Sequence, residues 1–471
     1  MPLVYLAIPL IAVVILNVLF KWVSGKTALI TGMAVAVIQM VLAAVDLSKV
    51  LSTGNSLLSS YVTALSIDWF GAVVLFIIGL IEFVTLLVSY TTVKSSVFSF
   101  GNVAMLLMLG MNGIVMVTDL FSLYVFIEVT SAASFILIAI NKKRDELEGA
   151  FKYYLMSALA TVMMLLSIAI LFMLAGDVTY ASVAAYVTGL AGQYPAALVA
   201  AIIMFIAALS IKSGAVPFHT WVPDAHSSAP SPVSVILAGV VIKVSGAYAL
   251  MRVYKDVFLN NPAVGGALSI LALASIIIGA LGAMGQTDIK RMLAFSSVSQ
   301  VGYIVLGAST GSALGFLGAV LHFFNHATFK SLLFVDAAAV LKQTGTRDMD
   351  KMGGLAEKMP FTGTSSVLGL LSMAGIPPLS GFWSKLLILM AVWQVNATLA
   401  IIALCASILT LTYFLILQKK VFFGKVAEGM EDVKEAHGSL VFVEVLLSGL
   451  NVITGIAVPF LLLFARSHGL L

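Results

Sequence analysis

Long apolar stretches, broken at short intervals by turn residues or charges, follow one another along almost the whole chain of 471 residues. A membrane-spanning helix needs about 20 predominantly apolar residues, and cutting the chain at each break predicts fourteen spans. The uncharged stretch 292–329 is too long for one crossing and is divided at the turn 307–311. The predicted spans centre near Ile11, Val37, Ile77, Met108, Phe126, Leu165, Met204, Ile236, Ala272, Val301, Leu321, Leu370, Leu404 and Ile453.

Composition supports an all-α integral membrane protein. Hydrophobic residues make up 61% of the chain and charged residues only 10%, whereas a soluble domain carries roughly 25% charged residues. No basic segment or cleavage site precedes the first apolar run, so residues 4–20 are predicted to be a span and not a removed signal. The single Cys405 excludes a disulfide framework and a Cys-rich metal or iron–sulfur site. The net charge of +4 comes from bases that are scattered between apolar runs and not clustered, so the sequence does not indicate a surface that binds nucleic acid.

The loop charges predict an orientation. The loops after even-numbered spans hold only Lys49, Arg252 and Lys255. By the positive-inside rule, the odd loops therefore face the cytoplasm and both termini lie outside a cell membrane. The bases of the odd loops are Lys21, Lys26, Lys94, Lys142, Lys143, Arg144, Lys290, Arg291, Lys342, Arg347, Lys351, Lys358, Lys419, Lys420, Lys425 and Lys434.

Five lysines fall at membrane depth: Lys152, Lys212, Lys243, Lys330 and Lys385. A lysine at the bilayer centre costs about 2.5 to 3.5 kcal/mol on insertion scales, so such residues usually face a bundle interior or a water path. Lys152 begins its span and can extend its stem to the interface. Lys330 also approaches the end of its span, whereas Lys212, Lys243 and Lys385 have apolar residues on both sides.

Acids at depth are scarcer than lysines. Glu128 is the clearest, and Glu82 is a second that could either serve transport or be buried and protonated. Glu444 stands near the start of the last span and is predicted to be an interfacial charge. Burial disfavours both a carboxylate and an ammonium, while pairing the two restores their charges. A Glu and several Lys along one interior path can therefore exchange protons.

Two predicted spans contain Gly/Pro breaks beside a lysine. In the seventh span Lys212 precedes Gly214 and Pro217, and in the twelfth Lys385 follows Pro377 and Pro378. Broken helices are tolerated in membranes where neighbouring helices or water satisfy the freed backbone groups. The mirrored order is what an inverted-topology repeat with discontinuous helices would leave.

The eleventh span carries His322, His326 and Lys330 at a spacing of four, which places them on one helical face. Two His at this spacing could bind a metal, but no third ligand or HExxH glutamate accompanies them. A protonatable stripe is favoured, because His titrates near neutrality. Core histidines bonded to the backbone are the alternative.

Several motifs together resemble the antiporter-like membrane subunits of respiratory complex I, membrane-bound hydrogenases and Mrp-type cation/proton antiporters. They are KSGAVPFHTWVPDAHSSAPSPVS at 212–234, KVSGAY at 243–248, DIKRMLAFSSVSQVGY at 288–303, the stripe 322–330 and PPLSGFWSK at 377–385. The resemblance runs from about the fourth span to the thirteenth. The stretch TGTRDMDKMGGL at 344–355 and the histidines His322 and His326 look closest to the D-type subunit of Mrp antiporters and its counterparts in membrane-bound hydrogenases. Lys385 disfavours those relatives that carry glutamate at this place.

The resemblance implies fourteen helices with two inverted five-helix repeats, helices 4–8 and 9–13, and discontinuous helices 7 and 12. It divides the chain into residues 1–100 (helices 1–3), 101–256 (first repeat), 257–420 (second repeat) and 421–471 (a loop and helix 14). It also implies a proton path whose residues are Glu128, Lys212, Lys243, His322, His326, Lys330 and Lys385. Glu82, His219, Asp224 and His226 form a second tier.

Three functions follow as alternatives. The chain is a proton-translocating subunit of a redox-driven complex, a subunit of a secondary Na+/H+ antiporter, or a structural membrane subunit. Buried lysines argue against the third, because a spacer has no need of them. We expect no catalytic, cofactor or metal site in this chain, and we expect redox cofactors, if any, in partner membrane subunits. Lysine-rich paths suit H+ better than Na+, which prefers the carboxylate oxygens that Glu82 and Glu128 could supply.

Overall fold

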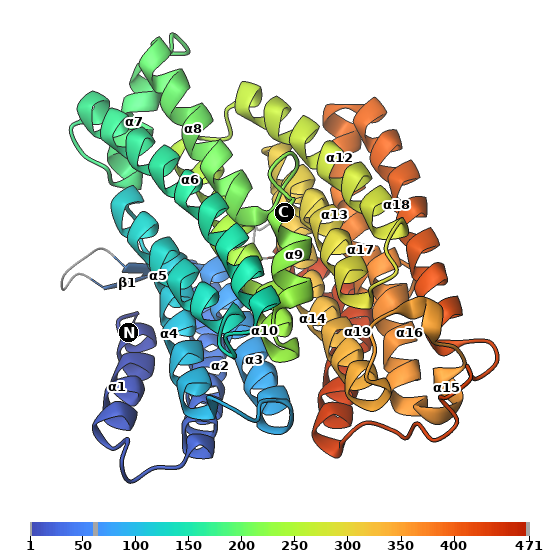
Figure 1. Cartoon of the computed structure of the whole chain (residues 1–471). Helices are drawn as coiled ribbons and strands as arrows, with labels where there is room; N and C mark the ends of the chain where they lie inside the picture. The colour runs from blue at the N-terminus through green and yellow to red at the C-terminus, as the bar shows by residue number, and fades with distance from the viewer. Residues whose placement is uncertain (1, 60–64, 468–471) are drawn as a thin grey trace. The chain divides into compact units, whose positions relative to one another are not determined.

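The computed structural model describes residues 2–59 and 65–467, and these are almost entirely helical (Figure 1). The first part holds α1 (Val4–Val18), α2 (Gly25–Thr53), β1 (Leu57–Ser59), β2 (Leu65–Ile67), α3 (Trp69–Thr92), α4 (Val97–Met116), α5 (Leu120–Ile138), α6 (Arg144–Ala175), α7 (Tyr180–Gly189), α8 (Ala196–Ser213), α9 (Trp221–Ser228) and α10 (Ser231–Ile236). Helix α10 continues through η1 (Leu237–Val241), η2 (Lys243–Tyr248), α11 (Ala249–Arg252) and η3 (Val253–Val257). Then follow α12 (Pro262–Met284), α13 (Ile289–Ser309), α14 (Ala313–Thr344), η4 (Met349–Lys351), α15 (Leu355–Lys358), α16 (Pro360–Ala374), α17 (Ser380–Val395), α18 (Ala397–Leu417), η5 (Gln418–Phe422) and α19 (Gly438–Ser467).

The helices confirm an all-α membrane architecture, and each of the fourteen predicted span centres lies in a helical segment of its own. Within the described residues, 11 helices are long and apolar enough to cross a membrane. The other three predicted spans are α1, which is short, α14, which carries the polar stripe, and the interrupted pair α16 and α17. Helix α7 is an additional helix of 10 residues.

The described chain forms two compact units. The first comprises residues 1–86, 94–214 and 240–265, and the second comprises residues 87–93, 215–239 and 266–471. In the first unit α6 packs along α5 and α8, and α4 packs against α1, α2 and α5 (Figure 1). In the second unit α14 is central, with α13, α16, α17 and α19 around it. The predicted repeats, residues 101–256 and 257–420, stay a prediction, because the two compact units divide the chain at other residues.

A matching pair of short backbone ladders supports the repeat. In the first unit Asp119 caps α5 and bridges Thr179, which follows α6. In the second unit Asp288 caps α13 and bridges Asp348, which follows α14. The side chain of each aspartate accepts the backbone N–H of the residue three positions later in the chain, as N-caps do. The same connection therefore occurs once in each predicted repeat.

The two broken helices also match. Helix α8 ends at Gly214 (φ 65°) and α16 ends at Gly375 (φ 85°), both in the left-handed region. A cis peptide bond follows each glycine, between Val216 and Pro217 and between Pro377 and Pro378. Helices α9 and α17 then resume the chain. The discontinuities predicted for helices 7 and 12 are confirmed.

Candidate functional site

Lys212 is the centre of a polar cluster inside the first unit. Its ammonium donates to Glu128 Oε1 at 3.0 Å, to Ser131 Oγ at 2.9 Å and to Ser157 Oγ at 2.5 Å. Glu128 and Ser131 come from α5, and Ser157 comes from α6. Helix α6 packs against both α5 and α8. An ammonium has three hydrogens, and each finds an acceptor here. The lysine side chain is fully buried.

Glu128 connects this cluster to the surface of the chain. Its Oε1 accepts hydrogen bonds from Lys212 and, at 2.8 Å, from Thr161 Oγ1 on α6. The side chain is 32% exposed while that of Lys212 is 0% exposed. The pair therefore has one buried end and one end that a neighbouring molecule or subunit can approach.

Lys243 is buried in the first unit, at the start of the π-helical segment η2. Widened π turns inside membrane and soluble helices occur frequently at functional sites. Three residues later Gly246 lies against the backbone of Ser213, so closely that a Cβ there would stand 2.3 Å from Ser213 Cα. This close approach packs the lysine-bearing segment against the end of α8, next to Lys212.

Lys385 lies in the second unit on α17, and no carboxylate pairs with it among the residues that the structure describes. Its ammonium donates to the carbonyl oxygens of Met373 at 2.8 Å and Ala374 at 3.4 Å, which end α16. It also lies 4.8 Å from the ring centroid of Tyr303, a cation–π distance. The aliphatic stem packs on Gly375, where a Cβ would stand 3.1 Å from Lys385 Cδ. The negative end of the α16 dipole favours a cation at this place.

His322, His326 and Lys330 on α14 are all buried in the second unit. His322 Nδ1 lies 2.9 Å from Ser384 Oγ, one residue before Lys385. The rings of His322 and His326 are parallel within 8°, with centroids 6.2 Å apart. Lys330 donates to the Leu293 carbonyl at 2.7 Å and to Ser296 Oγ. His322 therefore bonds the residue that precedes Lys385, and both His322 and Lys385 lie against the ring of Tyr303, whereas Lys330 bonds α13.

The second-tier residues divide into different settings. Glu82 is fully buried on α3, and neither carboxyl oxygen has a hydrogen-bond partner among the described residues. Asp224 on α9 pairs with Arg291 at 2.5 Å. The buried ring of His226 stacks on Phe334 at 5.1 Å, and His219 meets the ring of Phe295 at 6.3 Å.

Some sequence-based expectations need correction. Glu444 is not an interfacial charge: it is fully buried, because α16 and α14 cover its face of α19. Lys290, assigned to a cytoplasmic loop, is buried and donates to the Ala229 carbonyl at 2.6 Å. Lys152 does reach the surface and pairs with Glu148 at 2.8 Å. Asp336, 2% exposed, was missed, although a single acid within the otherwise apolar run 332–341 was a usable signal.

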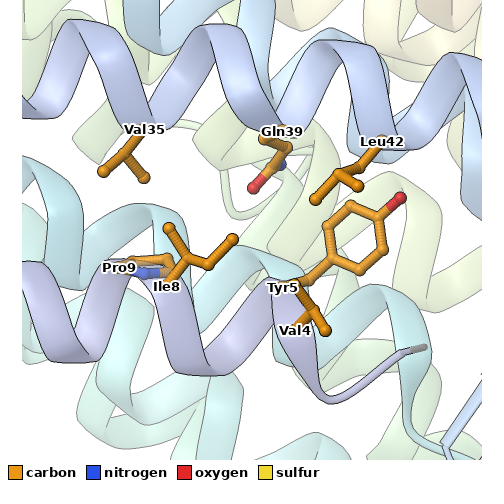
Figure 2. A pocket seen from close by; sticks show the side chains of 7 residues that line it. All are labelled: Val4, Tyr5, Ile8, Pro9, Val35, Gln39 and Leu42. Atoms are coloured by element: carbon orange, nitrogen blue, oxygen red, sulfur yellow. The ribbon is translucent and has the colours of Figure 1, made fainter.

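Two cavities, one in each unit, measure about 10 Å³ each and are too small for an organic ligand. One of about 10 Å³ lies between α1 and α2, lined by Tyr5, Pro9, Val35 and Gln39 among others (Figure 2). Small-molecule sites occupy roughly 300–1,000 Å³. Among the described residues no group of three or more His, Cys, Asp or Glu is arranged to hold a metal ion.

Comparison with known proteins gives matches over most of the chain. Residues 117–410 match the family described as NADH:quinone oxidoreductase/Mrp antiporter, TM. The D-type subunit of a Na(+)/H(+) antiporter from Alkalihalophilus pseudofirmus is 32% identical over 394 residues, which cover 83% of this chain and 79% of the relative. NADH-quinone oxidoreductase subunit N 1 from Rhizobium meliloti is 32% identical over 437 residues, 90% of this chain and 88% of the relative.

The fold is also shared with a solved structure. A chain of the Mrp complex from Dietzia sp. DQ12-45-1b superposes with a TM-score of 0.91 at 22% identity, covering 99% of this chain and 96% of that chain. The sequence matches extend over most of the chain and include both broken helices. The protein therefore belongs to the NADH:quinone oxidoreductase/Mrp antiporter family, as an antiporter-like, multi-pass membrane subunit of Mrp- and complex I-type assemblies.

Proposed function

We propose that this chain moves protons across the membrane along its buried Glu, Lys and His residues. The observation that carries the proposal is the Glu128–Lys212 pair, an ion pair at 3.0 Å between two helices that span the membrane. Charges at this depth are costly and mark ion paths or proton relays. A subunit that only spaced its neighbours would gain nothing from them.

The proposed mechanism is electrostatic. While Glu128 is ionised, its charge stabilises a proton on Lys212, which gives the pair its 3.0 Å hydrogen bond. When that pair loosens, the ammonium loses its counter-charge and only the hydroxyls of Ser131 and Ser157 remain as acceptors. The proton then moves on, with Lys243, His322, His326, Lys330 and Lys385 as the further carriers. The exposed side of Glu128 is where a neighbouring subunit can change the pair.

Two processes could be coupled to proton transport in this proposal. A redox-driven complex is one possibility, with all redox cofactors in partner subunits, and exchange against Na+ is the other. The relatives carry both kinds of name, an Na(+)/H(+) antiporter subunit and an NADH-quinone oxidoreductase subunit. Neighbouring genes distinguish them: hydrogenase or quinone-reductase subunits favour the first, and only small membrane subunits favour the second. We place the chain in the cell membrane, with the odd loops cytoplasmic and both termini outside.

Alanine substitutions test the proton path. Lys212→Ala and Glu128→Ala should each abolish proton transport in vesicles that contain the assembled complex, because each leaves half of the central pair. Subunit assembly, measured by co-purification, should be unchanged. Glu148→Ala, which removes the acid of a surface pair on α6, is the matched control. Unimpaired transport in either central variant would refute the proposed path.

A separate sodium route through Glu82 has its own test. If Na+ used this carboxyl, Glu82→Gln should abolish Na+-dependent activity while Lys243→Ala should not. Equal losses in both variants would point to one shared path.

A further inference from the structure

Three carboxyl groups from separate segments of the second unit meet one turn of α16. Ser365 Oγ donates to Asp336 Oδ1, from α14, at 2.5 Å. Thr362 Oγ1 lies 2.9 Å from Glu435 Oε1, in the loop before α19, and 3.1 Å from both carboxyl oxygens of Glu444 on α19. We call Asp336, Glu435 and Glu444 the acid cluster. None of the three belongs to the proton path proposed above.

The acid cluster has no basic partner. Among the described residues, no Lys, Arg or His forms an ion pair with any of its members. Two bases of the same region bond other groups: Lys342 donates to the Thr91 carbonyl, and His437 bonds Ser439. Buried like charges without counter-charges are strongly unfavourable. The cluster must therefore hold protons.

The hydrogen count at Thr362 shows where one proton is held. A hydroxyl has one hydrogen, so Thr362 can donate to only one of the two glutamates. Glu435 already accepts backbone N–H groups from Phe361 at 2.7 Å and Ala436 at 2.9 Å, which suits an ionised carboxylate. Glu444 has no other donor in the described structure, so its own carboxyl must supply the second hydrogen. The chain of donation is Glu444 to Thr362 to Glu435.

The three acids of the cluster differ in how exposed their side chains are. Glu435 is partly exposed, whereas Glu444 and Asp336 are buried. Glu435 can therefore exchange protons with water at the end of α14 that is predicted to be cytoplasmic. Asp336 Oδ2 has no hydrogen-bond partner among the described residues, so it is free to accept a proton.

A cavity adjoins Asp336. It measures about 10 Å³ and is lined by Asp336, Ser366 and Leu293 among others. A volume of this size holds about one water. The carbonyl of Leu293 is the acceptor for the Lys330 ammonium at 2.7 Å. The cavity thus lies between the acid cluster and the backbone that holds a residue of the proposed path.

We propose that the acid cluster is a proton-loading site that takes protons from the predicted cytoplasmic side and passes them to Lys330. Glu444 first passes its stored proton to Asp336, and Asp336 passes a proton to Lys330 by way of the cavity. The Thr362 hydroxyl then turns from Glu435 to the emptied Glu444, accepts a proton that has entered at Glu435 and donates its own proton to Glu444. Each step breaks one O–H bond and forms another, except that the transfer to Lys330 forms an N–H bond, so no other reactant is needed. This inference rests on the proposed function.

Infrared difference spectroscopy of the purified complex tests proton storage. A protonated carboxyl has a carbonyl band well separated from that of a carboxylate. We expect Glu444→Gln to remove such a band at neutral pH, and Thr362→Val to remove or shift it. Thr362→Ser, which keeps the hydroxyl, should preserve it, as should Glu431→Gln at an exposed acid of the same loop. An unchanged band in Glu444→Gln would overturn the proposal.

Proton uptake by vesicles tests delivery. Asp336→Asn keeps the side-chain volume but cannot relay a proton, and we expect uptake from the predicted cytoplasmic face to fall at least about tenfold. Glu431→Gln should leave uptake unchanged. Equal uptake in Asp336→Asn and Glu431→Gln would refute the loading site. Transport that survives Lys212→Ala would refute the proposed function instead, and the infrared band of Glu444 would still decide whether the cluster holds a proton.

Discussion

The two broken helices hold their lysines by different means. At the first break Lys212 is bound to a carboxylate and two hydroxyls from α5 and α6. At the second, Lys385 is bound to two backbone carbonyls at the end of α16 and to the face of Tyr303. Both breaks have the same left-handed glycine and cis proline. The shared backbone design therefore carries two different electrostatic environments.

This difference gives the two lysines different roles in the proposed path. A carboxylate partner can gain or lose a proton or move away, so the environment of Lys212 can switch. Backbone carbonyls and an aromatic face are permanent, so the environment of Lys385 is fixed. We therefore interpret Lys212 as the controlled carrier and Lys385 as a terminal one whose charge responds to arriving protons.

Methionine substitutions at the two lysines should separate these roles most strongly. Lys212→Met leaves Glu128 without its partner, whereas Lys385→Met leaves only carbonyl groups that neutral residues tolerate. We expect both variants to lose transport at least about 100-fold. Only Lys212→Met should also lower the melting temperature of the complex.

The control for the methionine variants is Lys419→Met, which removes a charge from an exposed position and should change neither transport nor melting temperature. If Lys385→Met lowered the melting temperature as much as Lys212→Met, the proposed difference in how the two lysines are held would be wrong.

A smaller effect should follow from trimming the hydroxyls at the first break. Ser157→Ala removes one acceptor of the Lys212 ammonium, and a hydrogen bond to a charged group contributes about 1.5–3 kcal/mol. We expect transport to change several-fold without being lost, because Glu128 and Ser131 remain. Ser167→Ala is the matched control on the same helix, since its hydroxyl bonds the Ala201 carbonyl and not the lysine. If both serine variants behaved alike, the hydroxyl at 157 would have no special part in holding Lys212.

The smallest effect on transport should come from an ion pair of the same unit that does not belong to the proposed proton path. Arg252 makes a two-pronged contact with Asp68, just before α3. Burial raises the pKa of Asp68, but the charge and hydrogen bonds of Arg252 outweigh it and lower the pKa from 3.8 to about 2. The pair therefore stabilises the fold above about pH 4, and this contribution is lost as the pH falls through about 2.

Asp68→Asn should accordingly reduce stability by about 2 kcal/mol at neutral pH and leave transport intact. The difference in melting temperature from wild type should shrink as the pH falls from about 4 toward about 2. Asp256→Asn, whose carboxylate lies 3.4 Å from Arg252, should lose less. If Asp68→Asn lost as much transport as Lys212→Met, any ion pair of the unit would be needed for transport. That result would contradict the specific role proposed for Lys212 at the first break.

Sequence patterns predicted the spans and breaks well for a physical reason. In lipid every backbone group must be bonded within the segment, so spans are long apolar helices and interruptions must be marked by residues such as Gly214 and Pro377. A lysine within such a span is conspicuous, and Lys212, Lys243 and Lys385 are all buried as expected. The spacing of four on α14 likewise fixed which side chains share a face.

The sequence could not determine which buried groups meet. Glu128 and Lys212 are 84 residues apart, and their pairing depends on how α5, α6 and α8 pack. The burial of Glu444 and Asp336 was misjudged or missed for the same reason: a charge near a helix end is at an interface or in the interior according to the neighbours that cover it. Hydropathy along one segment determined the membrane helices and their breaks, and only the tertiary packing decided which charges have partners.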